Sequence, residues 1–315
     1  MRIKTALASL LILIAQAGCL KAEAWNDFGH MTVAYVAYKH LNPQTKSRVD
    51  ALLKLNPYYE QWKNQLGQKI SDDERNAEIF MFAATWPDLI KRDAKYISDG
   101  DSDGNRPVGP GATQNTGYSD MQMHKYWHFY DQPFAVDKSK LPAIPNPNAL
   151  TQIASFRKVI ASNAPDELKS YDLTWLMHMV GDVHQPLHCA TRVSKYYPYS
   201  DNGGNDVLLN YKGLNYKLHG FWDGALGTGG AESVIKFADS LKAAKASMAA
   251  KSSEKTWAKE SFQLSQKKVY VPPIKWGNGP FEMTNGYEES AVNTAKERVE
   301  LGGERLANLL NQELK

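Results

Sequence analysis

The sequence predicts a mainly α-helical protein with a single domain and one small β-hairpin. Apolar residues recur at the three- and four-residue spacing of amphipathic helices along most of the chain. The 315 residues, 43% of them hydrophobic, are enough to build a well-packed core, and this length allows one or two domains. Because no internal repeat and no linker divides the chain, we expect one helical bundle over residues 25–315.

The first 24 residues are expected to be a signal peptide (1–24) rather than part of the fold. Arg2 and Lys4 form a charged start, and residues 6–17 are apolar but too short to span a bilayer. Ala22, Glu23 and Ala24 then have the small-x-small form of a cleavage site. Cleavage there gives a protein that begins at Trp25 and is secreted, either to the periplasm or to the extracellular medium.

The chain contains two cysteines, Cys19 and Cys189. Lipoprotein processing at Cys19 is an alternative to signal cleavage, but Gln16 stands where such a site usually has leucine. Signal cleavage removes Cys19, so the mature chain has no internal disulfide, and Cys189 is expected to be a small buried residue. A metal ion is the obvious alternative cross-link for an exported protein.

Charge and hydropathy indicate neither a basic nucleic-acid-binding arm nor a membrane helix. The formal net charge is +3, and no run of five or six like charges forms a nucleic-acid-binding arm. No segment after the leader is long and apolar enough to be a membrane helix, so we expect no stable membrane association. We also expect the protein to be a monomer.

Proline and glycine set the ends of the predicted elements. Pro43 closes the first helix, Pro186 stops the fifth, and Gly302-Gly303 either weakens the last helix or marks close helix packing. Residues 206–218 alternate as a β-hairpin that turns near Gly213. The predicted helices are 28–41, 46–55, 72–85, 149–162, 166–185, 230–250, 253–266 and 286–313.

Two long loops separate these helices, at 99–120 and at 131–148. The first begins with DGDSDG, which imitates the start of a calcium-binding loop. Its twelfth position is Pro110 rather than the glutamate that such loops need, so we interpret it as a solvated loop.

Histidine and aspartate occur twice at the spacing of one helical turn. His178 and Asp182 are one such pair, His219 and Asp223 are the other, and His188 follows the proline that ends the first helix. A histidine one turn from a carboxylate is often only a surface pair. Here both pairs lie in apolar, tryptophan-containing segments, where the side chains need a partner, and this favours two ligands presented to a zinc ion.

Other histidines and aspartates extend this set. His30, Asp88 and His128 are further candidate ligands, each within two residues of a tryptophan or phenylalanine. Structural roles are expected for the remaining histidines: His40 at a helix end, where a cation suits the helix dipole, His124, and His184, which lies off the face of Asp182.

The ordered series of motifs resembles a known family, the secreted zinc-dependent single-strand-specific nucleases of fungi and plants, the mung bean nuclease type. Bacterial zinc phospholipase C is a related branch. The resemblance covers nearly the whole mature chain and implies the helical-bundle fold of these two groups. It runs from Trp25 through WPD, HFYD, HxxxDxHQPLH, GGN and LHxxWD to WxxES at 257–261 and ERLANLLN near the end.

The resemblance implies a trinuclear site with three Zn²⁺ ions. Trp25 contributes its free amino group and carbonyl, so this ligand exists only after cleavage at Ala24-Trp25. Asp182 bridges two of the ions. The implied ligands are Asp88, His128, His178 and Asp182 for the first ion, Trp25, His30 and Asp182 for the second, and His188, His219 and Asp223 for the third.

The resemblance also implies an endonuclease mechanism. A zinc pair lowers the pKa of bound water, so hydroxide is available near neutral pH. Metal-bound hydroxide would attack phosphorus, the 3′-oxygen would leave, and the products would carry 5′-phosphate. Asp88 and Asp182 are the catalytic carboxylates in this scheme, and Lys91 matches a basic position that balances phosphate charge; the alternative for Lys91 is a helix-surface lysine.

Three further positions match residues that contact the nucleotide. Phe129 would stack on a base, Asp131 would hydrogen-bond it, and Asn205 would contact the nucleotide. The expected substrates are single-stranded DNA and RNA, with 3′-nucleotidase activity as well. A choline-lipid phospholipase C is the alternative, but that branch ends its third site with glutamate where this chain has Asp223. A purely structural zinc protein is the third hypothesis, and a bridged, carboxylate-rich cluster argues against it.

Overall fold

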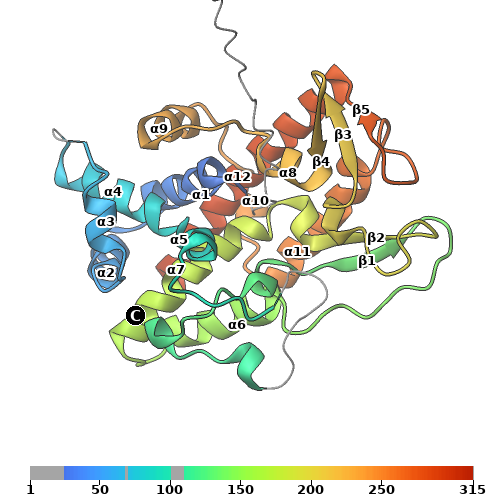
Figure 1. Ribbon diagram of the computed structural model, residues 1–315. Helices are drawn as coiled ribbons and strands as arrows, with labels where there is room; N and C mark the ends of the chain where they lie inside the picture. The colour runs from blue at the N-terminus through green and yellow to red at the C-terminus, as the bar shows by residue number, and fades with distance from the viewer. Residues whose placement is uncertain (1–24, 68–69, 101–109, 315) are drawn as a thin grey trace, which may run out of the picture.

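The computed structural model describes residues 25–67, 70–100 and 110–314, and its fold is mainly helical with two small sheets (Figure 1). The predicted signal peptide and most of the DGDSDG segment lie outside the described residues. Three helices form the centre: α1 (Asp27–His40), α7 (Asp166–Asp182) and α12 (Asn285–Glu313). The others are α2 (Pro43–Leu53), α3 (Tyr59–Lys63), α4 (Asp72–Ala83), α5 (Trp86–Leu89), α6 (Ala149–Ile160), α8 (Leu218–Asp223), α9 (Ala231–Asp239), α10 (Ala246–Ala249) and α11 (Glu254–Leu264).

Helix α1 packs closely along α12 at a glycine. A β-carbon at Gly303 would lie 2.5 Å from Cβ of Val36 and 2.8 Å from the Val33 carbonyl oxygen. Any larger residue would push the two helices apart, so Gly302-Gly303 marks close packing and leaves α12 unbroken. This contact fixes α1, the helix that carries His30.

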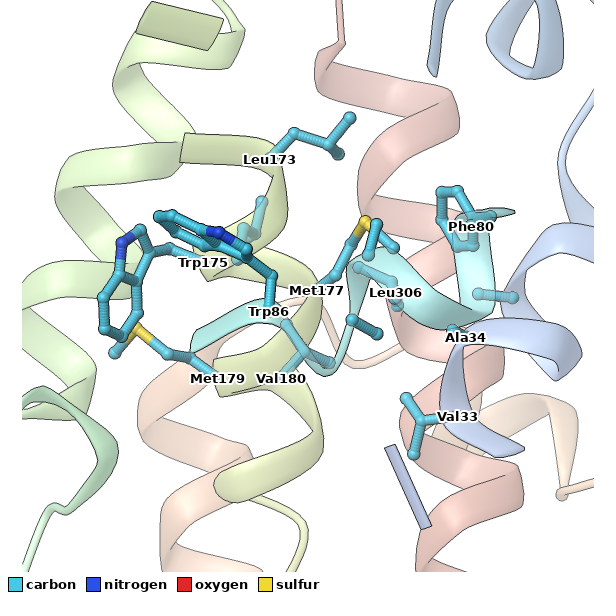
Figure 2. Packing of buried hydrophobic residues seen from close by; sticks show 14 of the residues in the cluster. Val33, Ala34, Phe80, Trp86, Leu173, Trp175, Met177, Met179, Val180 and Leu306 are labelled. Atoms are coloured by element: carbon cyan, nitrogen blue, oxygen red, sulfur yellow. The ribbon is translucent and has the colours of Figure 1, made fainter. Parts of the chain in front are cut away.

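Helix α7 is buried along nearly its whole length. Its tryptophan, Trp175, meets Trp86 of α5 edge to face, with ring centres 6.2 Å apart. Figure 2 shows Met177 and Val180 of the same helix among the buried side chains, with Leu306 of α12 nearby. The two ligand candidates of this helix, His178 and Asp182, are buried with it and therefore need partners in the interior.

Several helix starts follow from local capping. Asn26 accepts a hydrogen bond from the backbone N–H of Gly29 at the start of α1, and Ser71 and Glu74 form a capping box at the start of α4. Helix α2 begins three residues earlier than predicted, because Asn42 caps it and Pro43 takes the first helical position.

Two predicted boundaries are wrong. The single helix expected at 230–250 is two short helices, α9 and α10; α9 ends where the Ser240 hydroxyl bonds back to the Phe237 carbonyl at 2.6 Å. Helix α7 ends at Asp182, four residues before Pro186, and Pro186 begins a short 3₁₀ turn, Pro186–Cys189.

The predicted hairpin is present. Strands β3 (Leu208–Tyr211) and β4 (Leu214–Lys217) pair antiparallel through a turn in which Lys212 and Gly213 have φ of 52° and 80°. Two positive φ angles are typical of a type I′ turn. Strand β5 (Phe281–Glu282) adds in parallel to β3, and β1 (Gln132–Ala135) pairs in parallel with β2 (Ala190–Val193); neither pairing was predicted.

Among the described residues, no helix combines the length and the apolar character that crossing a membrane requires. The one cysteine in this part of the chain, Cys189, is buried as expected and unpaired.

Candidate metal centre

The structure brings eight of the nine predicted ligands together as three groups of buried histidine and aspartate side chains. Within each group the candidate ligand atoms lie within 4.8 Å of one another. The groups are His30, Asp88 and His178; His128, His178 and Asp182; and His188, His219 and Asp223. Every one of these residues is at most 4% exposed.

The first predicted ligand set is compact. Asp182 Oδ2 lies 3.0 Å from His128 Nδ1 and 3.5 Å from His178 Nε2. Asp88 Oδ1 lies 3.7 Å from His178 Nε2 and 4.0 Å from His128 Nδ1. Two nitrogen atoms bound tetrahedrally to one zinc at 2.0–2.1 Å are roughly 3.4 Å apart, so this spacing suits a shared zinc ion.

The second oxygen of Asp182 faces the other side. Asp182 Oδ1 lies 3.4 Å from Nε2 of His30, whose ring stacks on His178 at 3.7 Å. The carboxylate therefore stands between His30 on one side and His128 with His178 on the other. This is the placement that a bridging carboxylate needs.

The third predicted set has the most regular spacing. His188 Nε2 and His219 Nε2 are 3.2 Å apart. Asp223 approaches them with Oδ2 at 3.4 Å from His219 Nε2 and Oδ1 at 3.8 Å from His188 Nε2. The one-turn spacing of His219 and Asp223 in α8 thus places both groups against His188, which follows α7.

Backbone carbonyls fix the tautomer of three histidines. A carbonyl oxygen only accepts, so the Nδ1 atom bonded to it carries the hydrogen and Nε2 keeps its lone pair for a metal. The bonds are His178 Nδ1 to Ala84 O at 2.7 Å, His188 Nδ1 to His128 O at 2.9 Å and His219 Nδ1 to Gly203 O at 2.8 Å.

Burial governs the charge of the groups. It lowers the pKa of the His30 imidazole to about 4, and raises the pKa of Asp182 well above its usual range and that of Asp223 to about 7. Neutral imidazoles, together with carboxylates that lack a counter-charge, form a set of ligands suited to a divalent cation.

Several buried nitrogen and oxygen atoms of the site also lack a hydrogen-bond partner among the described residues. They are both ring nitrogens of His30, Asp88 Oδ2, His128 Nε2, Asp182 Oδ1 and Asp223 Oδ2. The residues present therefore fit metal ions.

Asp88 has a cation of its own. Lys91, one turn further along, places Nζ 2.6 Å from Asp88 Oδ1, and its side chain is 15% exposed. Burial raises the pKa of Asp88, but the charge of Lys91 and its hydrogen bond oppose this effect, and the pKa lies well below its usual range. Asp88 is therefore a carboxylate, and Lys91 lies between it and solvent.

Of the three predicted nucleotide contacts, Phe129 lies against the His188 group, and Asp131 and Asn205 are buried. The Phe129 ring stacks on His188 with ring centres 4.6 Å apart and lies 5.8 Å from His219, so one face of the ring is covered. Asp131 is buried and has a left-handed φ of 50°. Asn205 is buried, and its Oδ1 has no hydrogen-bond partner among the residues that the structure describes.

Two contributors to the site were not singled out from the sequence. Gln185 donates from Nε2 to Asp223 Oδ1 at 2.6 Å and so orients that carboxylate. A β-carbon on Gly181 would lie 2.8 Å from His30 Nδ1, so glycine makes room for the histidine. Gln185 lies inside the HQPLH motif, so the sequence could have indicated its role in the site. No local sequence pattern indicates the role of Gly181.

Trp25 is the ninth predicted ligand, and the structure places its side chain beside the first two groups. The indole is buried and donates to the Gly181 carbonyl at 3.0 Å. The predicted cleavage site before it lies outside the described residues, so the role of its amino group stays a prediction.

The histidines given structural roles have other partners. His124 is buried between Asp99 and Asp120, at 2.8 and 2.9 Å. His184 bonds the Val180 carbonyl at 2.7 Å and Arg305 at 2.9 Å, rather than any candidate ligand.

Comparison with known proteins agrees with this arrangement. A family model described as S1/P1 nuclease matches residues 25–315. The chain is 25% identical to Nuclease S1 of Aspergillus oryzae over 205 residues, which are 63% of this chain and 53% of the relative. It is 32% identical to Endonuclease 2 of Arabidopsis thaliana over 76 residues, which are 24% of this chain and 23% of the relative. The match thus spans about half the length of the Aspergillus protein and less of the Arabidopsis protein. This chain belongs to the S1/P1 nuclease family.

Proposed function

We propose that residues 25–315 form a secreted zinc-dependent endonuclease that hydrolyses phosphodiester bonds of single-stranded DNA and RNA to 5′-phosphate products, and that also acts as a 3′-nucleotidase. The observation that carries the proposal is the placement of Asp182, whose two oxygens face histidines on opposite sides. Two metal ions sharing one carboxylate suit in-line displacement at phosphorus. Family membership supports the same activity.

The proposed metal ligands are the nine predicted residues, with three zinc ions. Bound zinc would supply a nucleophile by lowering the pKa of water, and would balance charge on the phosphoryl oxygens. Asp182, with one oxygen toward His30 and the other toward His128 and His178, would hold both of the first two ions. Gln185 holds Asp223, and the three carbonyl-bonded histidines keep their Nε2 lone pairs turned to the metals.

Lys91 is the proposed phosphate contact. Its Nζ lies 2.6 Å from Asp88, and its partial exposure allows it to reach a substrate oxygen. A cation fixed beside the developing negative charge stabilises a phosphoryl transition state more than the ground state. Loss of Lys91 is therefore expected to lower kcat more than it raises KM.

Phe129, Asp131 and Asn205 are the proposed base and nucleotide contacts. His188 covers one face of Phe129, so a base would stack on the other face, with the Phe129 ring between it and His188. Stacking accepts any unpaired base, whereas a paired base in a duplex does not offer its face. This supports single strands as the substrate.

The matching experiment compares substrates and metal states on the processed protein. Zinc-loaded wild type should cleave single-stranded DNA and RNA and dephosphorylate 3′-AMP, and a chelator should abolish all three activities. Asp182→Asn, which keeps the shape but removes the bridging charge, should lose cleavage while circular dichroism shows the same helix content. Phosphatidylcholine is the contrasting substrate.

Each outcome has a distinct meaning. Chelator-sensitive hydrolysis of phosphatidylcholine without nucleic-acid cleavage would refute the nuclease assignment in favour of a phospholipase C. Cleavage that survives complete zinc removal would refute the role of the metals. Amino-terminal sequencing of the exported protein tests the cleavage before Trp25, and light scattering tests the expected monomer.

A further inference from the structure

A fourth group of potential metal ligands lies away from the candidate metal centre. His40, at the end of α1, meets Glu300 and Glu304 of α12, and one ligand atom from each lies within 4.8 Å of the others. His30 and His40 are ten residues apart on α1, so the fourth group is about 15 Å along the helix from the first. It is therefore too distant to share a metal ion with the nuclease site.

Glu300 is the unusual member of this group. Its residue is 6% exposed, yet its carboxylate has no hydrogen bond and no ion pair among the described residues. Burial raises the pKa of Glu300 to about 7, with Glu304 adding to the effect. A carboxylate without a partner on a largely buried residue is costly, and a second carboxylate one turn of helix away makes the cost larger.

The nearby cation Lys39 does not pair with the Glu300 carboxylate. Lys39 is one residue from His40, but its Nζ forms an ion pair with Asp239 at 2.7 Å. Its charge lowers the pKa of Glu300 only as the weakest of the three contributions. The side chains around Glu300 therefore leave its charge unbalanced.

Hydrogen bonds fix the backbone at the end of α1 and the side chain of Glu304. Asn311 donates to the His40 carbonyl at 3.0 Å and accepts from the backbone N–H of Asn42 at 3.0 Å. Glu304 accepts from the backbone N–H of Ala244 through one oxygen, Oε1, at 2.9 Å. Asn311 thus ties the end of α1 to α12, Glu304 ties α12 to the segment before α10, and the other oxygen of Glu304 is left for another partner.

We propose that His40, Glu300 and Glu304 bind a divalent zinc-class metal ion that fastens the end of α1 to α12. An imidazole nitrogen with two carboxylates suits Zn²⁺ better than Ca²⁺ or Mg²⁺, which prefer oxygen ligands throughout. His40 is exposed, which gives the ion a path from solvent. The close contact of the two helices at Gly303 keeps the ligands on facing surfaces.

The test measures zinc content and thermal unfolding on the full processed protein. Wild type, Glu300→Gln, His40→Gln and the control Glu297→Gln, an exposed glutamate of the same helix, are dialysed against micromolar free zinc. Wild type and the control should hold one more zinc per chain than Glu300→Gln or His40→Gln. Added zinc should also raise the Tm of wild type and the control more than that of these two variants.

The outcomes separate this site from the nuclease site. Equal zinc content in wild type and in both variants would overturn the proposal, as would a Glu300→Gln protein that is simply more stable with no change in zinc. His40→Gln alters an exposed residue, so it remains informative if Glu300→Gln misfolds. Cleavage of single-stranded DNA should be unchanged in folded variants; a wild type without nuclease activity would refute the proposed function and leave this site standing.

Discussion

Replacing Asp172 by asparagine should stabilise the protein at alkaline pH. Asp172 is fully buried in α7, and burial raises the pKa of its carboxyl to about 8, although the side-chain amide of Asn115 donates to both of its oxygens, at 2.7 and 2.9 Å. The amide oxygen of Asn115 has no hydrogen-bond partner among the described residues. An asparagine at 172 would keep one acceptor oxygen for the Asn115 amide and would carry no charge at any pH.

The magnitude follows from linkage. An unfolded aspartate titrates near pH 3.9, so the folded state binds the proton of Asp172 more tightly over the range from about 4 to about 8. Because the folded state then holds more protons than the unfolded state, stability falls as pH rises through this range. At about 1.4 kcal/mol per pKa unit, the loss is on the order of 5 kcal/mol by pH 8.5.

Urea unfolding of zinc-saturated wild type and Asp172→Asn at pH 5 and pH 8.5 measures this. The variant should gain several kcal/mol over wild type at pH 8.5, and the gain should shrink at pH 5. Glu167→Gln, exposed in the first turn of the same helix, should show no such pH-dependent gain. A constant difference between Asp172→Asn and wild type at both pH values would refute the reasoning.

Three more outcomes test the site. Gly181→Ala should displace His30, because the added methyl would lie 2.8 Å from its ring; we expect zinc affinity at that site to fall by roughly 10- to 100-fold in a zinc titration. Lys255 and Lys259 line a cavity of about 610 Å³ beside the Phe129 segment. Changing both to glutamine should raise KM for oligonucleotides and make the slope of log K against log salt concentration less steep by about 1.4. Turnover of 3′-AMP should be unchanged. Chelation should abolish activity. It should also lower Tm by about 10 °C for each site at which the free zinc concentration was 1,000 times the Kd before chelation. Far-ultraviolet circular dichroism should show that the helices persist.

The controls for these outcomes are matched substitutions. Gly286→Ala adds a methyl with no atom within 4 Å, so zinc binding should stay at the wild-type level. The double change Lys242→Gln and Lys245→Gln removes two exposed lysines elsewhere and should leave KM and the salt dependence unaltered. Equal effects in the control and the Lys255/Lys259 pair would show that only net charge matters, and loss of helix content on chelation would favour a structural zinc.

Local sequence was sufficient where neighbouring residues decide the geometry. The β3–β4 hairpin turns at Gly213 as expected, because a two-residue turn with positive φ needs glycine. His219 and Asp223 face one another at 3.4 Å because one helical turn brings positions i and i+4 together. The single helix expected at 230–250 failed because Ser240 bonds back to the chain, a competition that apolar spacing does not reveal.

The sequence by itself therefore determined the helical class, the hairpin and the one-turn histidine–aspartate pairs, since each depends on residues a few positions apart. Only the tertiary structure brought His30, Asp88 and His128 to Asp182 from distant parts of the chain. It also decided which nitrogen of each carbonyl-bonded histidine is free, because the carbonyls of Ala84 and Gly203 carry no side-chain signal. Distances across the core depend on how whole helices pack, as at Gly303, and no local pattern encodes that packing.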